Sequence, residues 1–422
     1  MIVTRRNVPA SARRQRGAVA IIVGLSLAVL IGAAGLALDT GRLYVTKTEL
    51  QNASDACALG ASFELTGFPS IPAGNFAIAE AAGRTVAARN RVGFQATSID
   101  QNSVTVEFGT ALTGGTWLTA GSTPSPTAKY VRCTIPETNI LSWFMQVRGA
   151  PPSTVRSAAT ASLVPSQQSC NGLPIGLCAP STTSPYGLVP GKWYNGGLSN
   201  SGQLTGNFNW VDYSPPNGGV SELKAILEGP GVCLTNVGTQ VGQSGAAQSL
   251  RTSWNTRFGI YTNDYNAAEQ LAIKPDRSGY GYTALNWDAV AGNALADFIA
   301  TRRPANTPYG IPNVANGNTI TGLDVKPPNS TVLQPAALAL RGASRRIATA
   351  PILDCTVLAA STTAPILDYG CVLMLHPMDN NPALTIYMEY IGLANAAGGP
   401  CAGSGIPGGP LSTGPKVPGL VQ

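Results

Sequence analysis

Residues 13–63 read RRQRGAVAIIVGLSLAVLIGAAGLALDTGRLYVTKTELQNASDACALGASF and join a basic patch, an uncharged apolar stretch and an amphipathic continuation. The apolar stretch, 18–38, carries no charge in its 21 residues. A helix rises about 1.5 Å per residue and the hydrocarbon core of a bilayer is about 30 Å thick, so this stretch is long enough to span a membrane. We therefore predict a transmembrane helix over 18–38.

The charges on either side of the span predict its orientation. Five arginines precede it, and the first acidic residue of the chain, Asp39, follows it directly. The positive-inside rule places 1–17 in the cytoplasm, as a basic segment, and residue 39 onward across the membrane. Small residues over 33–37 keep open the alternative of a cleaved secretory signal. Because the apolar region is long for a signal and the helical pattern continues beyond it, we favour a retained anchor.

The helical pattern extends past the membrane. One face of the continuation recurs at steps of three, four and seven residues, as the buried face of an amphipathic helix does. The residues of this face are Leu43, Leu50, Ala53, Cys57 and Gly60. We expect the helix to run to about Phe63 and to pack this narrow stripe on a soluble body. An apolar first half and an amphipathic second half on one helix is the pilin plan.

This stretch resembles the N-terminal segment of TadE/TadG-like proteins, which are membrane-anchored components of the tight-adherence (Flp) pilus assembly machinery of bacteria. The matching features are Arg16-Gly17 before the span, the Asp39-x-Gly41-Arg42 junction and the run LQNASDA over 50–56. The resemblance implies a scaffold or minor pilus-associated subunit in the bacterial inner membrane, with other pilus-assembly subunits as partners.

The resemblance also bears on processing. Prepilins that are cleaved after the glycine typically carry a glutamate five residues later, and Ile22 stands at that position here. We therefore favour an uncleaved protein, similar to the TadG branch of the family.

Composition is typical of an extracytoplasmic body. Charged residues make up only 11% of the chain, while Gly (48) and Pro (32) are plentiful. The hydrophobic share of 44% is sufficient for folded cores. Much of the net charge of +6 comes from the N-terminal arginines, so nothing favours nucleic-acid binding. The length predicts two or three domains.

The eight cysteines indicate disulfides in an oxidising compartment. A zinc site is disfavoured, because the chain has one histidine and no pair of cysteines at zinc-ligand spacing. Cys170 and Cys178 flank a short loop and are expected to bond locally. The further candidate pairs are Cys57 with Cys133 and Cys371 with Cys401. Free buried thiols are the alternative for both of these pairs.

The sequence predicts an α+β fold in which a small antiparallel sheet lies against the long helix, as a pilin-like domain over 39–164. Its expected elements are a helix at 75–91, strands at 103–109, 129–136 and 153–164, and a short helix at 139–147.

Residues 165–396 are expected to form a second, irregular, disulfide-bearing mixed α/β domain, which resembles the C-terminal region of TadG-like proteins more loosely. A helix is expected near 221–227, and paired strands at 371–376 and 384–391. The Gly/Pro-rich tail, 397–422, is expected to be poorly ordered apart from a disulfide at Cys401.

Nothing in the sequence nominates an enzyme. Many TadG-like proteins carry a von Willebrand-type metal signature, but the nearest match, Asp212-x-Ser214, lacks the second serine and is followed by two prolines. The single histidine, His376, has no Gly-x-Ser-x-Gly partner for a triad. We expect no catalytic residues, no metal, no cofactor and no small-molecule substrate. A secreted hydrolase with an unrecognised site is the most remote alternative.

One binding hypothesis comes from aromatic residues in the second domain. Aromatic faces among Asn and Gly residues are typical of surfaces that bind sugars or peptides. The candidates are Trp193, Tyr194, Trp210 and Tyr213. An exposed cluster would indicate an adhesin, which is the alternative function. The competing interpretation is that these side chains fill the core of a Gly-rich domain.

Overall fold

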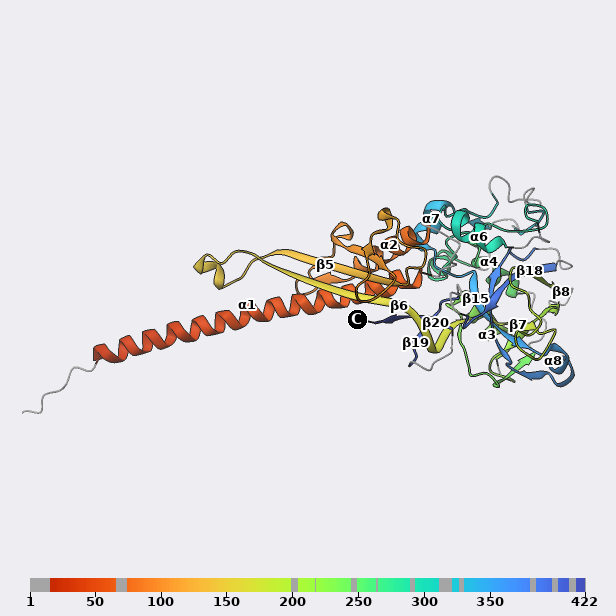
Figure 1. The fold of residues 1–422 in the computed structure, drawn as a ribbon, viewed down its shortest axis with the longest axis horizontal. Helices are drawn as coiled ribbons and strands as arrows, with labels where there is room; N and C mark the ends of the chain where they lie inside the picture. Colours follow the sequence, from red (N-terminus) through yellow and green to blue (C-terminus); the bar gives the residue numbers. More distant parts are fainter. Residues whose placement is uncertain are drawn as a thin grey trace, which may run out of the picture.

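The computed structural model shows one long helix that carries two bodies (Figure 1). The residues that it describes are 16–65, 74–198, 204–216, 218–243, 249–262, 265–288, 293–310, 321–325, 330–379, 385–396, 401–409 and 415–421. Four disulfides connect elements within these bodies.

Helix α1 (Arg16–Phe63) contains 48 residues and no proline, which corresponds to about 72 Å of uninterrupted helix. Most of its apolar half projects away from the two bodies (Figure 1), and its most apolar 18-residue window is only 6% buried within the protein. That exposure distinguishes it from the core helix of a soluble protein. The helix therefore fits the predicted single membrane span.

The second half of α1 packs on the first body through small side chains. Leu50, Ala53 and Cys57 of the predicted face are fully buried, whereas Leu43 and Gly60 are half-buried. A Cβ at Gly60 would lie 3.0 Å from Val86 Cγ2 on α2 (Gly74–Ala87), so the stripe lets the two helices approach closely. The same stripe lies on β5 (Tyr130–Ile140) and β6 (Ser153–Gly172).

The strands of the first body pair antiparallel, with β3 (Thr105–Gly109) next to β5 and β5 next to β6. The predicted helix at 139–147 is wrong. The chain continues as β5 to Ile140, because pairing with β6 extends to the register Ile140↔Ser153, and only a 3₁₀ turn, η3 (Met145–Arg148), follows. Long-range strand pairing has overridden a local helical preference. The other elements of this body are β1 (Arg91–Val92), β2 (Thr97–Ser98), β4 (Trp117–Leu118), η1 (Gln101–Ser103) and η2 (Ala120–Ser122).

Strand β6 joins the two bodies, so the sheet of the first body is not separate. Among the described residues, sixteen strands form one hydrogen-bonded network, and β6 pairs with five of them. The predicted domain boundary between residues 164 and 165 thus lies inside a strand. The hydrophobic cores nevertheless divide there, since the first contains buried residues up to Ala161 and the next begins at Leu173.

The second body is built on a mixed sheet. Strand β15 (Ile347–Leu353) pairs parallel with β7 (Ile175–Cys178) and antiparallel with β17 (Asp368–Met374), which pairs with β18 (Thr385–Leu393). The other strands are β8 (Trp193–Leu198), β9 (Leu204–Gly206), β10 (Phe208–Asp212), β11 (Val232–Cys233), β12 (Gln240–Gln243), β13 (Ile260–Tyr261), β14 (Thr331–Val332) and β16 (Thr363–Pro365). The helices are α3 (Gly219–Glu228), α4 (Leu250–Thr256), α5 (Ala267–Ala272), α6 (Ala294–Asp297), η4 (Phe298–Arg302), α7 (Pro335–Arg341) and α8 (Cys355–Ser361).

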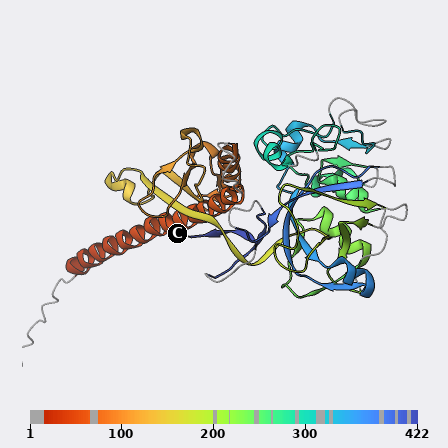
Figure 2. The same ribbon diagram turned by 45° about the vertical axis from the view of Figure 1, so that its right-hand side comes forward.

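The described parts of the C-terminal tail are ordered, contrary to expectation. Strands β19 (Ser404–Pro407) and β20 (Lys416–Leu420) both pair antiparallel with β6, and β20 also contacts α1. Figure 2 shows this tail returning from the second body to the first, and Figure 1 shows the C-terminus beside α1. The main chain of a Gly/Pro-rich segment can still donate and accept ladder hydrogen bonds, which composition alone does not reveal.

Candidate functional site at the membrane-exit segment

Asp39, the first residue after the apolar stretch, binds the tip of the β5–β6 hairpin. We define the hairpin tip as residues 141–145. The Asp39 carboxylate accepts backbone hydrogen bonds from Trp143 (2.7 Å), Phe144 (3.0 Å) and Met145 (2.8 Å). These N–H groups precede or begin η3, where the backbone has no internal partner for them. A single carboxylate on α1 thus satisfies three donors of a segment about a hundred residues away.

Arg42 adds a second link to the hairpin tip from the same face of α1. Its Nη1 donates to the Leu141 carbonyl at 2.6 Å, and its guanidinium lies 4.9 Å from the centroid of the Trp143 ring. Residues three apart on a helix share a face, so Asp39 and Arg42 act on the tip together. The Asp-x-Gly-Arg junction therefore has a structural role in this chain.

Gly35 allows the hairpin tip to reach back along the apolar stretch. A Cβ at Gly35 would lie 2.8 Å from both Cβ and Cγ of Phe144, which is closer than packed carbon atoms come. By contrast, a Cβ at Gly32 would meet nothing within 4 Å. Phe144 therefore packs on α1 four residues inside the predicted span.

A second acidic residue of α1 holds a second loop. Glu49 accepts backbone hydrogen bonds from Phe94 (3.2 Å) and Gln95 (3.0 Å), and both of these residues have positive φ, 60° and 62°. A bulky aromatic residue rarely adopts this left-handed conformation, which costs free energy. The Phe94 ring stacks on Trp143, with centroids 6.4 Å apart and planes 10° apart.

Sequence reasoning missed this site. Glu49 is not among the residues of the predicted buried face, whereas the structure buries it. Its partners lie 45 and 46 residues further along the chain, so no local spacing could reveal them. For Asp39 the sequence did contain a signal, because this first acidic residue of the chain directly follows the predicted span.

The cysteines are all paired, and one predicted pair is wrong. Cys170 bonds with Cys233, and Cys178 with Cys355. Cys170 lies on β6 and Cys178 ends β7, so the chain between them is largely extended, and at about 3.3 Å per residue its ends lie too far apart for a bond. The other two pairs agree with the expectation: Cys57 bonds with Cys133, and Cys371 with Cys401.

The four candidate ligand-binding aromatics lie in the core and form no exposed surface. Trp193, Tyr194, Trp210 and Tyr213 are each at most 9% exposed. Their polar groups bond within the protein: Trp193 Nε1 donates to Glu389 (3.0 Å), Tyr194 Oη accepts from the Val189 N–H (2.8 Å), and Tyr213 Oη donates to the Leu173 carbonyl (2.9 Å). The core interpretation therefore replaces the ligand-binding one, because all four side chains belong to buried hydrophobic clusters of the second body.

Asp212 and Ser214, the nearest match to a metal signature, lie before α3 and form hydrogen bonds with its first turn. Asp212 accepts from the backbone N–H groups of Ser214 (2.8 Å) and Gly219 (3.2 Å), and Ser214 Oγ donates to Glu222 (2.8 Å). Burial and the hydrogen bond with Asp212 raise the pKa of Glu222. For Asp212, burial opposes ionisation, but hydrogen bonds from Glu222, Ser214 and the nearby glycines outweigh it and lower its pKa. Asp212 therefore ionises more readily than Glu222.

His376 is a core residue. Nδ1 donates to the Pro377 carbonyl (2.9 Å), and Nε2 accepts from the Tyr387 N–H (3.2 Å), which requires a neutral ring. Complete burial, assisted by the charge of Arg346, lowers the pKa of His376 to about 4. Among the described residues, no group of three or more His, Cys, Asp or Glu side chains could hold a metal ion.

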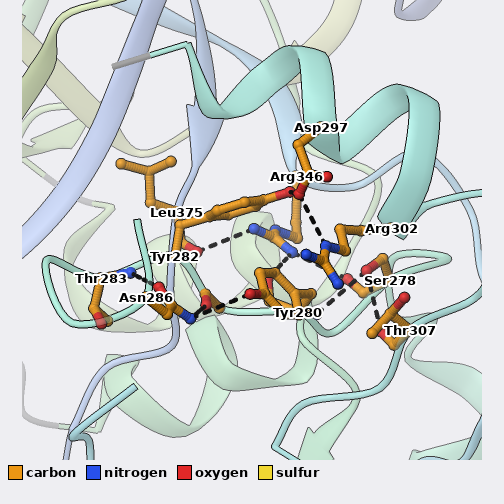
Figure 3. A network of polar contacts seen from close by, with 11 residues as sticks. Ser278, Tyr280, Tyr282, Thr283, Asn286, Asp297, Arg302, Thr307, Arg346 and Leu375 are labelled. Atoms are coloured by element: carbon orange, nitrogen blue, oxygen red, sulfur yellow. Dashed lines mark hydrogen bonds and ion pairs between the residues drawn. The ribbon is translucent and has the colours of Figure 1, made fainter. Parts of the chain in front are cut away.

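A buried arginine organises the irregular segment before α6 (Figure 3). Arg346 donates to the carbonyls of Tyr280 (2.6 Å), Met374 (2.7 Å) and Leu375 (3.1 Å). Burial lowers its pKa to about 10, so it remains charged at neutral pH. Asp297 accepts from Tyr282 Oη and from Arg302 in the same network. These contacts replace regular secondary structure in holding the segment, so we assign them a structural role.

An open cleft of about 400 Å³ lies where the end of α1 meets the second body. Its lining includes Phe63 from α1 and Glu228 and Arg345 from the second body. The guanidinium of Arg345 donates hydrogen bonds to the carbonyls of Leu227, Glu228 and Lys274. Its Nη donors are therefore engaged by the backbone. Lys274, the other cation of the described lining, is exposed.

The fold and the membrane-exit site define a class: a protein with one apolar N-terminal helix that continues into an α+β body and is held to that body just beyond the apolar stretch. A family model described as "Putative Flp pilus-assembly TadE/G-like" matches residues 17–73. The match covers the span, the Asp39–Arg42 junction and the buried stripe, so the resemblance is confirmed over this segment. Residues 17–73 of this chain are thus similar to the TadE/TadG-like pilus-assembly family. No curated protein and no solved structure matches the chain.

Proposed function

We propose that this protein is a membrane-anchored structural or assembly component of the tight-adherence (Flp) pilus system. The observation that carries the proposal is helix α1, because the segment matched by the family is the one whose first half is exposed and apolar and whose second half packs on a body. The protein acts as a scaffold or minor pilus-associated subunit through helix packing in the membrane and contacts of its bodies.

The proposed location is the bacterial inner membrane, with the N-terminus in the cytoplasm and the bodies in the periplasm or at the cell surface. The arginines before the span and Asp39 after it support this orientation. Four disulfides support an oxidising compartment for both bodies. In spheroplasts, protease added outside should digest the bodies. Digestion only after lysis would contradict this orientation.

The division into a pilin-like domain over 39–164 and a second domain over 165–396 is part of the same proposal. The packing of α1 across paired strands supports the first domain, and the change of hydrophobic core between Ala161 and Leu173 supports the boundary.

Deletion of the gene in its native host tests the pilus role. We expect loss of Flp pili and of surface attachment, and recovery of both when the full chain is supplied. A strain that keeps normal pili and attachment without this protein would contradict the proposal.

N-terminal sequencing of the native protein distinguishes an anchored assembly factor from a processed pilus subunit and from a secreted protein. An intact Met1 indicates an anchored assembly factor, which the Ile22 position favours. A start at Ala18 would indicate prepilin-type processing and entry into the polymer. A start after Ala37 would indicate secretion and would contradict the anchor.

The adhesin alternative loses its support, because the aromatic cluster on which it depended is buried.

A further inference from the structure

The hairpin tip presents an apolar surface to the outside of the protein. Leu141, Trp143, Phe144 and Met145 are 37–55% exposed, with Trp143 the most exposed at 55%. Four large apolar side chains in five consecutive positions are unusual for a water-facing turn, where polar residues and glycine prevail. Unlike the scattered apolar residues of the second body, these side chains form one contiguous segment.

The position of the tip relates this surface to the membrane. Asp39 is the first charged residue after the apolar stretch, and the tip is bonded to it at 2.7–3.0 Å. Phe144 packs on Gly35, which lies four residues, or about 6 Å of helix, further into the stretch. If 18–38 occupies the bilayer, the tip lies at the depth of the headgroups and the upper acyl chains.

The chemistry of the tip suits that depth. Trp and Tyr are enriched at membrane–water interfaces, and Arg reaches phosphate groups there while its aliphatic stem stays in apolar surroundings. Arg42 lies over the Trp143 ring, and Tyr44 of α1 is also exposed. Backbone N–H groups near lipid are costly when they lack acceptors. Asp39 supplies acceptors to three of them, which lowers the cost of bringing the turn to the bilayer.

The loop held by Glu49 extends the same surface. Phe94 is 54% exposed and stacks on Trp143, so its ring continues the apolar patch from the tip toward the body. Its left-handed backbone is stabilised by the Glu49 carboxylate. The left-handed backbone of Phe94 is unfavourable, yet it holds an exposed aromatic ring beside the tip. Packing in the core does not explain this arrangement, because the ring is not in the core.

We propose that the hairpin tip, together with Phe94, inserts into the interfacial layer of the lipid bilayer on the side where the bodies lie. The protein then contacts the membrane at two places, the α1 span and the tip. Because the tip is fixed to α1 by Asp39 and Arg42, this second contact sets the rotation and the height of the first body above the membrane. The proposal requires the span over 18–38 but does not depend on the pilus role.

Quenching of tryptophan fluorescence by brominated lipid tests the insertion. The full chain is reconstituted in phosphatidylcholine vesicles whose acyl chains are unlabelled or brominated near the headgroup. Of the six tryptophans, Trp143 is the one at the tip; Trp117 is half-buried in the first body, where it stacks on Arg132, and the other four are in the second body. The variants are Trp143→Phe and, as the matched control, Trp117→Phe.

We expect brominated lipid to quench the wild-type protein and the Trp117→Phe control, and Trp143→Phe to lose most of this quenching. Flotation of the vesicles verifies that each protein is anchored. Equal quenching of Trp143→Phe and wild type in anchored protein would overturn the insertion while leaving the span intact, and no quenching of wild type would indicate a tip in water or on a protein partner. Wild-type protein that fails to float with the vesicles would overturn both the span and the insertion.

Discussion

Single carboxylates on α1 decide how the loops of the first body are placed. Asp39 and Glu49 are ten residues apart, and each accepts backbone N–H groups from a loop that bears an exposed aromatic ring. A carboxylate is an acceptor with two oxygens, so one side chain can satisfy several donors at once. Hydrogen bonds to a charged group are also stronger than neutral ones.

Substitution of Asp39 tests its role. In Asp39→Ala the amides of Trp143, Phe144 and Met145 lose their acceptor, and each unsatisfied donor costs about 1–3 kcal/mol. We expect hydrogen exchange of these amides to accelerate at least about tenfold, which corresponds to ~1.4 kcal/mol. Asp55→Asn, on the same helix, should leave their exchange unchanged. Equal protection in Asp39→Ala and wild type would show that the tip is held by other contacts.

His376 predicts a pH dependence of stability. Its pKa is about 4 when folded and 6.5 ordinarily, so between these values the unfolded chain binds a proton that the folded protein does not. Stability from this residue is complete above about pH 6.5 and is lost as the pH falls toward 4, by roughly 3 kcal/mol in total. His376→Gln should flatten the stability curve over this window. An unchanged slope in thermal unfolding between pH 4 and 7 would refute the assignment.

At the scale of elements, helix α1 is one helix with two environments. The most apolar window of its first half is only 6% buried and meets the first body at Gly35, whereas its second half is covered by α2, β5 and β6. The hairpin tip lies at the change between them. Small residues control how closely each neighbour approaches, as Gly35 does for Phe144 and Gly60 does for Val86.

Replacing each of two glycines of the apolar stretch by leucine distinguishes the effect of the contact with Phe144 from the effect of added apolar surface. Gly35→Leu would place Cβ 2.8 Å from Phe144 and should displace the hairpin tip, with faster exchange of the Phe144 amide. Gly32→Leu adds the same apolar surface and the same helix propensity but meets nothing within 4 Å. We expect the second variant to match wild type. Equal effects of the two substitutions would mean that the contact with Phe144 is unimportant.

The pairing of β20 with β6 predicts that the tail contributes to stability. Val417 is fully buried and Leu420 is 47% exposed on the same strand. Val417→Asp places an unpaired carboxylate in the interior and should lower the free energy of unfolding by about 2–4 kcal/mol. Leu420→Asp should change it by less than about 0.5 kcal/mol. Thermal unfolding of the two variants measures the difference, and similar values would show that the strand does not stabilise the fold.

At the scale of the whole molecule, the two bodies are connected by β6, by the returning tail and by a buried ion pair. Arg303 Nη2 in the second body lies 2.9 Å from Glu64 Oε2, one residue past the end of α1, and the two side chains are 1% and 8% exposed. The pair makes the end of the membrane helix part of the junction between the bodies. Motion of one body is therefore coupled to the anchor.

Removal of one partner of this pair should loosen the junction. Glu64→Ala leaves the Arg303 charge buried without its carboxylate, and breaking such a pair costs about 3–5 kcal/mol. The control is Glu80→Ala, which removes the partner of Arg84 in a more exposed pair on α2 and should cost at most about 1 kcal/mol. Limited proteolysis between the bodies reports the loosening. Equal resistance of both variants would show that β6 and the tail hold the junction alone.

The sequence by itself indicated an apolar helix long enough to span a membrane, the continuation of α1 to Phe63 and the presence of disulfides. These are properties of uninterrupted runs, of helical periodicity and of cysteine number, which neighbouring residues express without reference to the rest of the fold. Only the tertiary structure decided the partners of Cys170 and Cys178, the burial of Trp193 and Trp210, the pairing of the tail with β6 and the attachment of the hairpin tip to Asp39. Each of these joins segments tens to hundreds of residues apart, and their contacts depend on strand register and on the packing of small residues along α1.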